Sequence, residues 1–182
     1  VLSPPSVHPI LGVSNRLSVI SYGTPSGEFF NVQHSDEKGP GGYKSKIITN
    51  VGGVRKVKVT WHDSNFTAVS TVEDPTDPYD PRQRPWYIKA VAERSAIWTD
   101  PYIFFTAREP GVTSAIPVYG DDRRIIAVVG VDVKITRFSQ FLKTNWSPDD
   151  GGAFIVSTDG TLVVTPELGN GTLLQGSAEK HR

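Results

Sequence analysis

The feature that most constrains this sequence is the segment YDPRQRPWY, residues 79–87, where prolines, arginines and aromatic rings are denser than anywhere else in the chain. Pro81 and Pro85 each fix their own φ and push the preceding residue toward extended geometry. Pro85 also suits the first position of a helix, because the N–H that proline lacks would have no intrahelical partner there. The segment is therefore predicted to be a stiff loop that leads into a short helix over about residues 85–93.

The side chains of this segment form a candidate carboxylate-binding set. Arg84 carries a guanidinium group, Trp86 an indole N–H, and Tyr79 and Tyr87 carry phenolic hydroxyls. All of these groups can donate hydrogen bonds to a carboxylate, and the rings would shield such contacts from water. The alternative is an arginine stacked on aromatic rings at an ordinary surface, which is a common arrangement in proteins.

Strand patterns dominate the rest of the chain. The run IIAVVGVDV, residues 125–133, is the most apolar and is predicted to be a central strand buried on both faces. Strands that mostly follow one another, with helices at the margins, predict an α+β fold around an antiparallel sheet. The other predicted elements are a hairpin over 17–32, strands over 43–49, 54–62 and 66–72, antiparallel strands over 96–106 and 113–119, a helix over 135–143, and a hairpin over 153–165 that turns at 159–160.

Composition excludes several classes of partner. The chain of 182 residues has 19 basic and 19 acidic residues, so its charge does not favour nucleic acid or an anionic membrane surface. The run RKVK, residues 55–58, is better explained as the solvated face of a strand than as a binding patch. Cysteine is absent, which excludes disulfides and thiolate chemistry. No run approaches the ~20 apolar residues of a membrane-spanning helix.

The residues expected of an enzyme or a metalloprotein are missing. The four histidines are too scattered along the sequence for a metal site, and no phosphate-binding loop or nucleophile motif occurs. Asp74, Asp77, Asp80 and Asp100 could bind calcium, but the prolines between them fit turn chemistry better. We therefore expect no metal, no cofactor and no catalytic residues.

Four blocks of sequence, taken in order, resemble a known family. They are YDPRQRPWY (79–87), WTDPY (98–102), AIPVY (115–119) and VVGVD (128–132). These blocks resemble the Cache sensor domains, and more narrowly the membrane-distal module of the double Cache domains found in the extracytoplasmic part of bacterial chemoreceptors, histidine kinases and nucleotide cyclases. The resemblance covers about residues 17–142 and implies a PAS-like antiparallel sheet with flanking helices.

The resemblance also implies a ligand site. In the amino-acid-binding branch of this family, an aromatic residue, an arginine and a tryptophan hold the carboxylate of the ligand, while tyrosine and aspartate hold its ammonium group. The matching positions in this sequence are Tyr79, Arg84 and Trp86 on the carboxylate side and Tyr87, Tyr102 and Asp132 on the ammonium side. An acid at the end of an apolar strand suits an ammonium group, because a buried unpaired carboxylate would be costly.

Several alternatives remain open. Asp132 could instead cap the helix predicted over 135–143. Phe104 stands where the family can have a second ammonium-binding acid, so small carboxylates or amines are alternatives to a free amino acid. Two other functions are an enzyme that uses the same aromatic cleft, with Asp132 as its sole candidate acid or base, and a structural extracellular module whose cleft is filled by its own side chains.

The predicted organisation is a Cache-type PAS-like ligand-binding module over residues 1–145, followed by a linker and the start of a second, membrane-proximal Cache module over 146–182. The second assignment rests on AFIVSTDGTLVVTP, residues 153–166, which resembles the start of that module. The resemblance implies a small-molecule partner, and the balanced charge argues against nucleic acid. It also implies a membrane-anchored full-length receptor, with this part in the periplasm or outside the cell, and is compatible with a homodimer. The domain itself should catalyse no reaction.

Overall fold

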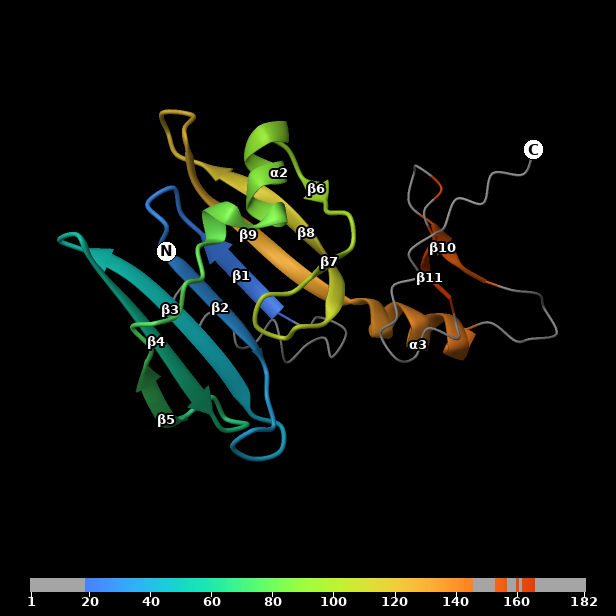
Figure 1. Ribbon diagram of the computed structural model, residues 1–182, viewed down its shortest axis with the longest axis horizontal. Coiled ribbons are helices and arrows are strands. Elements are labelled where there is room, and N and C mark those ends of the chain that lie inside the picture. Colours follow the sequence, from blue (N-terminus) through green and yellow to red (C-terminus); the bar gives the residue numbers. More distant parts are fainter. Residues whose placement is uncertain (1–18, 146–152, 157–159, 161, 166–182) are drawn as a thin grey trace. The chain divides into compact units, whose positions relative to one another are not determined.

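The computed structural model contains two compact units, each formed by two stretches of the chain (Figure 1). The first unit takes residues 1–99 and 113–132, and the second takes 100–112 and 133–182. Within the described part of the chain, no helix is both long and apolar enough to cross a membrane. The residues that the structure describes are 19–145, 153–156, 160 and 162–165.

The first unit is an antiparallel sheet that carries one α-helix. Its elements are β1 (Val19–Gly23), β2 (Phe29–His34), β3 (Tyr43–Val51), β4 (Val54–His62), β5 (Ala68–Glu73), the 3-10 helix η1 (Pro81–Gln83), α2 (Pro85–Glu93), β6 (Ile97–Trp98), and most of β8 (Pro110–Tyr119) and β9 (Ile125–Lys134). The strand order is β5-β4-β3-β2-β1-β9-β8-β6, so β9 lies between β1 and β8 although it comes last in the sequence. The predicted α+β fold and the central position of residues 125–133 are confirmed.

Two hairpins form the first part of the sheet: the predicted one over 17–32, and one that joins the two strands predicted over 43–49 and 54–62. β1 and β2 pair antiparallel from Gly23 opposite Phe29, which confirms the hairpin within the described residues. β3 and β4 pair from Val51 opposite Val54, and the loop between them is Gly52-Gly53, with φ of 59° and 79°. A two-residue hairpin loop of this type needs positive φ at both positions, which glycine adopts without strain.

Two predictions about strands were wrong. β9 is not buried on both faces: Val128 and Gly130 lie on one face and are buried, whereas Ala127, Val129 and Val131 on the other face are only part-buried. Its apolar sequence suggested two covered faces, but an antiparallel sheet can leave one face partly open. The predicted single strand over 96–106 is divided into β6 and β7 (Tyr102–Ile103). Pro101 stands between them and has no N–H to donate to a strand ladder.

The second unit has its own small core. β7 pairs with the first residues of β8, Tyr102 opposite Gly111, and β10 (Ile155–Val156) pairs antiparallel with β11 (Leu162–Val164). This pairing confirms the predicted last hairpin, although residues 157–159 of its turn lie outside the described residues, as does the predicted linker over 146–152. The module boundary at residue 145 stays a prediction. The core of this unit comes from α3 (Ile135–Asn145) and the hairpin, through Ile135, Phe138, Leu142, Ala153, Ile155 and Val164.

Candidate ligand-binding site

The loop that leads to α2 is built from aspartates that accept hydrogen bonds from the backbone two residues ahead. Asp77 Oδ1 accepts from the N–H of Tyr79 at 2.7 Å, and Asp80 Oδ1 accepts from the N–H of Arg82 at 2.9 Å. Asp74 makes the same type of turn. These are Asx turns, so the turn interpretation is confirmed for Asp74, Asp77 and Asp80. Among the described residues, no group of three or more His, Cys, Asp or Glu is arranged to hold a metal ion.

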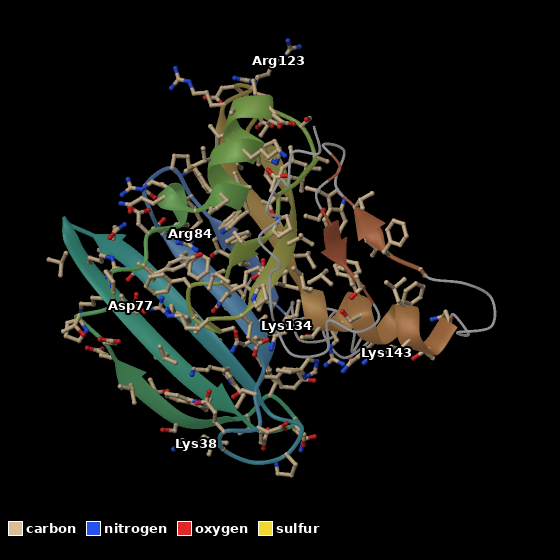
Figure 2. All side chains as sticks on the ribbon, turned by 45° about the vertical axis from the view of Figure 1, so that its right-hand side comes forward. Lys38, Asp77, Arg84, Arg123, Lys134 and Lys143 are labelled. Atoms are coloured by element: carbon tan, nitrogen blue, oxygen red, sulfur yellow. The ribbon has the colours of Figure 1, made fainter. Side chains whose placement is uncertain are left out.

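η1 and α2 follow directly from this loop. Asp80 caps η1 and pairs with Arg82 at 2.7 Å, and the hydrogen bonds from that side chain lower the pKa of Asp80. Arg84 has extended geometry, with φ −94° and ψ 145°, and α2 then begins at Pro85. The predicted helix is confirmed, with its start and its end at Glu93. Arg84 is the residue directly before α2, so its side chain lies where the loop meets the first turn of the helix (Figure 2).

The indole of Trp86 lies directly on the backbone of two strands. A side chain at Gly130 of β9 would begin 3.3 Å from Trp86 Cε3, and one at Gly23 of β1 would begin 3.3 Å from Trp86 Cη2. The ring of Tyr87 meets the indole edge-on, with the ring centroids 5.6 Å apart, and both residues are buried. The glycines therefore let α2 approach the sheet closely, since any side chain there would displace the indole.

Asp132 lies on the same face of the sheet as Gly130, because side chains two residues apart on a strand point the same way. Its Oδ1 accepts a hydrogen bond from Thr113 Oγ1 at 2.7 Å, and Thr113 is fully buried. Burial raises the pKa of Asp132 to about 6, and the Thr113 hydrogen bond and the charge of Arg84 act against that rise. Asp132 as a whole is only part-buried. Its carboxyl group, however, is closely surrounded by protein atoms, and this local burial raises its pKa.

The opposite charges of Arg84 and Asp132 are within electrostatic reach of each other, because Arg84 affects the pKa of Asp132. Within the described residues, Asp132 nevertheless forms no ion pair, and the hydrogen bond to its carboxyl group comes from Thr113 and not from a helix amide. A cation and an anion placed in this way can bind the two ends of a small zwitterion. Helix capping by Asp132 finds no support in this geometry.

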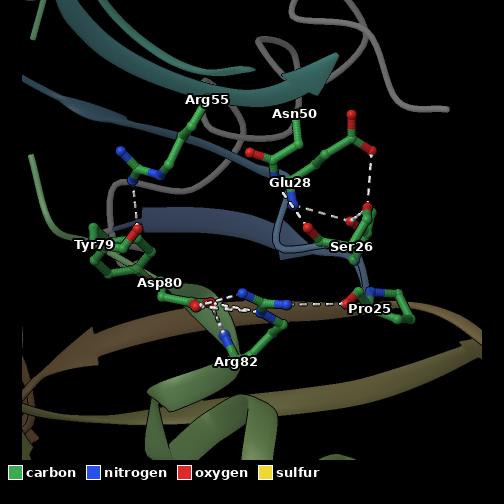
Figure 3. A network of polar contacts seen from close by, with 9 residues as sticks. Pro25, Ser26, Glu28, Asn50, Arg55, Tyr79, Asp80 and Arg82 are labelled. Atoms are coloured by element: carbon green, nitrogen blue, oxygen red, sulfur yellow. Dashed lines mark hydrogen bonds and ion pairs between the residues drawn. The ribbon is translucent and has the colours of Figure 1, made fainter. Parts of the chain in front are cut away.

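Tyr79 lies against the neighbouring strand β2. Its ring packs on Phe29 with the centroids 4.5 Å apart, and Phe29 is the register partner of Gly23, which lies under the Trp86 indole. The backbone carbonyl of Tyr79 accepts a hydrogen bond from Arg55 Nη2 at 2.7 Å (Figure 3). Five of the six predicted site residues belong to the first unit, namely Tyr79, Arg84, Trp86, Tyr87 and Asp132.

Tyr102 belongs to the second unit, so its part in the site stays a prediction. Its ring meets Phe104 edge-on at 5.2 Å between centroids. Phe104 is buried, and its ring lies over Gly111, where a side chain would begin 2.1 Å from Phe104 Cζ. The departure at Phe104 thus has a packing role within its own unit.

The sequence interpretation missed several residues near the site. Lys46 and Asp77 form an ion pair at 2.5 Å, and the side chain of each is only 9% exposed. Arg55, expected on a solvated strand face, donates hydrogen bonds to the loop carbonyls of Asp77 and Tyr79. Thr113 fell within a predicted strand and gave no sign of its contact with Asp132. These pairs are far apart in the sequence, and spacing alone gives no signal for them.

An antiparallel sheet with a loop and a helix packed on its glycine-containing strands fits the PAS-like fold that the sequence blocks imply. Residues 43–140, more than half of the chain, match the family model "Methyl-accepting chemotaxis protein-like, first PDC sensor domain". The chain belongs to this family of ligand-binding sensor domains, and the resemblance to Cache domains is confirmed.

Individual relatives agree with this family. The chain is 33% identical over 105 residues to the methyl-accepting chemotaxis protein PctB of Pseudomonas aeruginosa, which covers 58% of this chain and 16% of that protein. It is 24% identical over 161 residues to adenylate cyclase 1 of Rhizobium meliloti, covering 83% of this chain and 24% of that protein. The chain thus spans only 16 to 24% of the length of these two curated relatives.

Solved structures show the same fold. The ligand-binding domain of the Pseudomonas aeruginosa amino acid chemoreceptor PctB in complex with L-Arg matches with a TM-score of 0.55 and 23% sequence identity, covering 91% of this chain and 56% of that one. The sensory domain of the Campylobacter jejuni chemoreceptor Tlp3 matches with a TM-score of 0.56 and 15% identity, covering 90% of this chain and 51% of that one. At these identities the match supports the fold.

Proposed function

We propose that this sensor domain binds a small zwitterion, in the first place an L-amino acid, and that it does so outside the cytoplasm as the input part of a membrane-anchored receptor. The observation that carries the proposal is the placement of Arg84 and Asp132, which are oppositely charged and within electrostatic reach, while Asp132 forms no ion pair among the described residues. A bound zwitterion would place its ammonium group against the Asp132 carboxylate and its carboxylate against the Arg84 guanidinium.

The two ends of the ligand have separate donors and acceptors. Arg84 binds the carboxylate, and the hydroxyl of Tyr79 and the indole N–H of Trp86 add hydrogen bonds. Asp132 binds the ammonium group, and the hydroxyl of Tyr87 adds a hydrogen bond to it. Thr113 holds the Asp132 carboxylate through its hydroxyl, 2.7 Å away, which fixes the direction in which the carboxylate faces.

The relatives support an amino acid as the ligand class. Solved relatives include the ligand-binding domain of Pseudomonas aeruginosa PctB in complex with L-Gln and that of Pseudomonas fluorescens CtaA in complex with L-isoleucine. These ligands share the carboxylate and ammonium groups and differ in the side chain. This chain has Phe104 at the position where the family can have a second ammonium-binding acid. A small carboxylate or an amine is therefore the second candidate ligand.

In the whole receptor, ligand binding would change the packing of the sheet against its helices and so reach a cytoplasmic output. A ligand can shift such an equilibrium only by its difference in affinity for the two states. Because the curated relatives include chemotaxis proteins and an adenylate cyclase, the same type of input serves more than one output. The sensor domain itself needs to catalyse no reaction in this scheme.

A thermal-shift screen against amino acids, small carboxylates and amines tests the proposal. A ligand at about a hundred times its dissociation constant stabilises the folded state by about 2.7 kcal/mol, which is easily detected. Arg84→Ala should abolish the shift for amino acids and carboxylates. The matched control is Arg82→Ala, because Arg82 lies two residues away, is paired with Asp80 and has a half-exposed side chain.

Three outcomes separate the alternatives. A shift with amino acids that is lost in Arg84→Ala and kept in Arg82→Ala supports the proposal. A shift with amines alone that is unaffected by Arg84→Ala would favour an amine sensor centred on Asp132. If the folded protein responds to none of these compounds, the proposal is wrong and the structural module becomes the better interpretation.

A further inference from the structure

Three side chains outside the predicted ligand set hold the backbone and ring of Tyr79. We propose that Lys46, Arg55 and Asp77, here called the Asp77 clasp, are positioning residues that set the place of Tyr79 in the site and thereby its contribution to ligand affinity. This inference rests on the proposed function, in which Tyr79 contacts the carboxylate of the ligand. It adds residues that neither touch the ligand nor belong to the loop-to-helix segment 79–87.

Both oxygens of the Asp77 carboxylate are used. Oδ2 pairs with Lys46 Nζ at 2.5 Å, and Oδ1 accepts from the backbone N–H of Tyr79 at 2.7 Å. The carboxylate therefore joins a side chain of β3 to the backbone of the ligand-binding loop. If it turned away, both contacts would be lost together.

Arg55 holds the same piece of loop from β4. Its Nη1 donates to the carbonyl of Asp77 at 2.8 Å. Its Nη2 donates to the carbonyl of Tyr79 at 2.7 Å (Figure 3). The guanidinium group is a planar, rigid fork, so two such bonds fix the orientation of the backbone and not only its distance from the strand. The N–H and the C=O of Tyr79 are thus both held by the clasp.

Lys46 also reaches the ring of Tyr79. Its Nζ lies 5.2 Å from the centroid of that ring, which is within the range of a cation–π contact. The ring of Tyr79 also packs against the ring of Phe29, with the two ring centroids 4.5 Å apart. The ring position is therefore determined by β2 through Phe29 and by β3 through Lys46.

The Lys46–Asp77 ion pair is more deeply buried than the Lys44–Glu37 ion pair on the same strand. The side chains of Lys46 and Asp77 are each 9% exposed, whereas those of Lys44 and Glu37, which pair at 3.0 Å, are 22% and 53% exposed. A buried ion pair is often no more stabilising than apolar residues of the same size, but breaking it by removing one partner leaves an uncompensated charge. Geometric specificity next to a binding residue is a better reason for such a pair than stability.

The test compares Lys46→Met with Lys44→Met in the full 182-residue chain. Lys44 is a matched control, because it lies two residues away on the same face of β3, has its own ion pair, and has Nζ 4.9 Å from the Trp61 ring centroid. L-glutamine, L-arginine and L-leucine are titrated by calorimetry. We expect Lys46→Met to weaken binding at least tenfold, and Lys44→Met less than twofold.

Two further measurements distinguish positioning from a general loss of stability. In a Tyr79→Ala background, Lys46→Met should weaken binding less than twofold, because the residue through which it acts has been removed. Hydrogen exchange of the Tyr79 amide, measured without any ligand, should be at least tenfold faster in Lys46→Met than in wild type or Lys44→Met. Equal exchange in the two variants, or a Lys46→Met effect that persists in the Tyr79→Ala background, would overturn the proposal.

The exchange experiment also keeps the two proposals separable. If none of the three amino acids binds the wild-type protein, the proposed function is wrong for these ligands, whereas faster Tyr79 exchange would still establish the clasp as the device that holds this loop. If Lys46→Met does not fold, Asp77→Asn takes its place, because it removes the charge and keeps an oxygen that can accept from Tyr79. An Asp77→Asn protein with wild-type exchange and wild-type affinity would overturn the inference.

Discussion

Two partly buried carboxylates of the first unit have opposite kinds of surroundings. Asp77 pairs with the ammonium group of Lys46, while Asp132 accepts from the neutral hydroxyl of Thr113 and has a pKa that the charge of Arg84 lowers. Both regions use the same face of the sheet: Lys46, Asn31, Ser21 and Gly130 are successive register partners across β3, β2, β1 and β9.

The difference separates a structural carboxylate from a ligand-binding one. A carboxylate with its own cation has little to gain from a further cation and serves to hold the loop. A carboxylate that burial holds at a pKa of about 6, without an ion pair among the described residues, gains from an ammonium group that arrives. We therefore expect substitutions at Asp77 to lower both stability and affinity, through the position of Tyr79, and those at Asp132 to lower affinity alone.

The largest expected effect is that of Asp132→Asn. Amino acid affinity should fall at least ~100-fold, about 2.7 kcal/mol, because the charge that faces the ligand ammonium is removed. The free energy of unfolding should stay the same or increase, since a carboxylate that is costly to bury becomes neutral. Asp77→Asn should show the reverse order, with a clear loss of stability and a smaller loss of affinity. Calorimetry and urea unfolding of both variants measure this, and wild-type binding by Asp132→Asn would refute the comparison.

Arg84→Gln should have the next largest effect. The affinity for an L-amino acid should fall ~30-fold, because a charge-assisted bond to the carboxylate is worth roughly 2 kcal/mol. The decarboxylated amine of the same amino acid should bind Arg84→Gln about as well as it binds wild type. Arg82→Gln is the control, since Arg82 pairs with Asp80 at the surface. A similar loss for the amine would assign Arg84 to fold stability.

Binding should depend on pH through Asp132. Because its pKa is about 6, the carboxylate is mostly ionised at pH 7 and mostly protonated at pH 5. The amino acid keeps both of its charges over this range, so its affinity should fall roughly tenfold from pH 7 to pH 5. Titrations at both pH values measure this, and the Asp132→Asn variant should show no such slope. A slope that persists in that variant would mean that another group titrates.

Stability should respond to pH in the opposite direction. The pKa of Asp132 in the folded protein is about 6, above the ordinary value of 3.8, so the folded state binds this proton more tightly than the unfolded chain does. The stabilisation from protonation is complete below about pH 4 and is lost as the pH rises through 6. Between pH 4 and pH 7, the free energy of unfolding of wild type should fall relative to that of Asp132→Asn. The upper limit of this fall is about 3 kcal/mol, and the partial exposure of the residue makes the fall smaller. Urea unfolding across this range measures the difference.

The smallest expected effect is that of Gly130→Ala. The new methyl group would begin 3.3 Å from the Trp86 indole, the Ser21 hydroxyl and the Thr113 methyl, so these groups must shift by a few tenths of an ångström. Overpacking of this kind costs roughly 1 kcal/mol of stability, and affinity should fall a few-fold because the indole moves. Thermal unfolding and calorimetry measure the two effects. If affinity stays at the wild-type value while stability falls, the position of Trp86 does not limit binding.

The parts of the fold that could be predicted are those with a local cause. Pro85 placed the start of α2 correctly because its fixed φ and missing N–H act within one turn. The strands over 43–49 and 54–62 were also predicted, and the structure adds that Gly52 and Gly53 join them, because glycine adopts positive φ without strain. The strand over 96–106 was predicted wrongly because a β-prone composition outweighed Pro101, whose missing N–H interrupts any ladder.

The candidate site was predictable only in part, and for a different reason. Arg84, Trp86 and Tyr87 lie in one short segment and were chosen from their chemistry and from the family resemblance. That resemblance also supplied Asp132, but the sequence gave no means to see that Thr113 would be its hydrogen-bond partner. Ile126 showed the limit of composition, since an apolar run does not say which of its residues the fold will cover.

By itself, the sequence determined the antiparallel α+β class, the hairpins, the stiff entry into α2 and the family. These features depend on φ restrictions, turn residues and hydrophobic period, which act over a few neighbouring positions. The tertiary structure decided that Gly130 would lie under Trp86. It also decided that Asp77 would form an ion pair with Lys46, while Asp132 would accept a hydrogen bond from Thr113. The reason is that a charge or a cavity is defined by what surrounds it in space, and strand pairing brings together residues that are far apart along the chain.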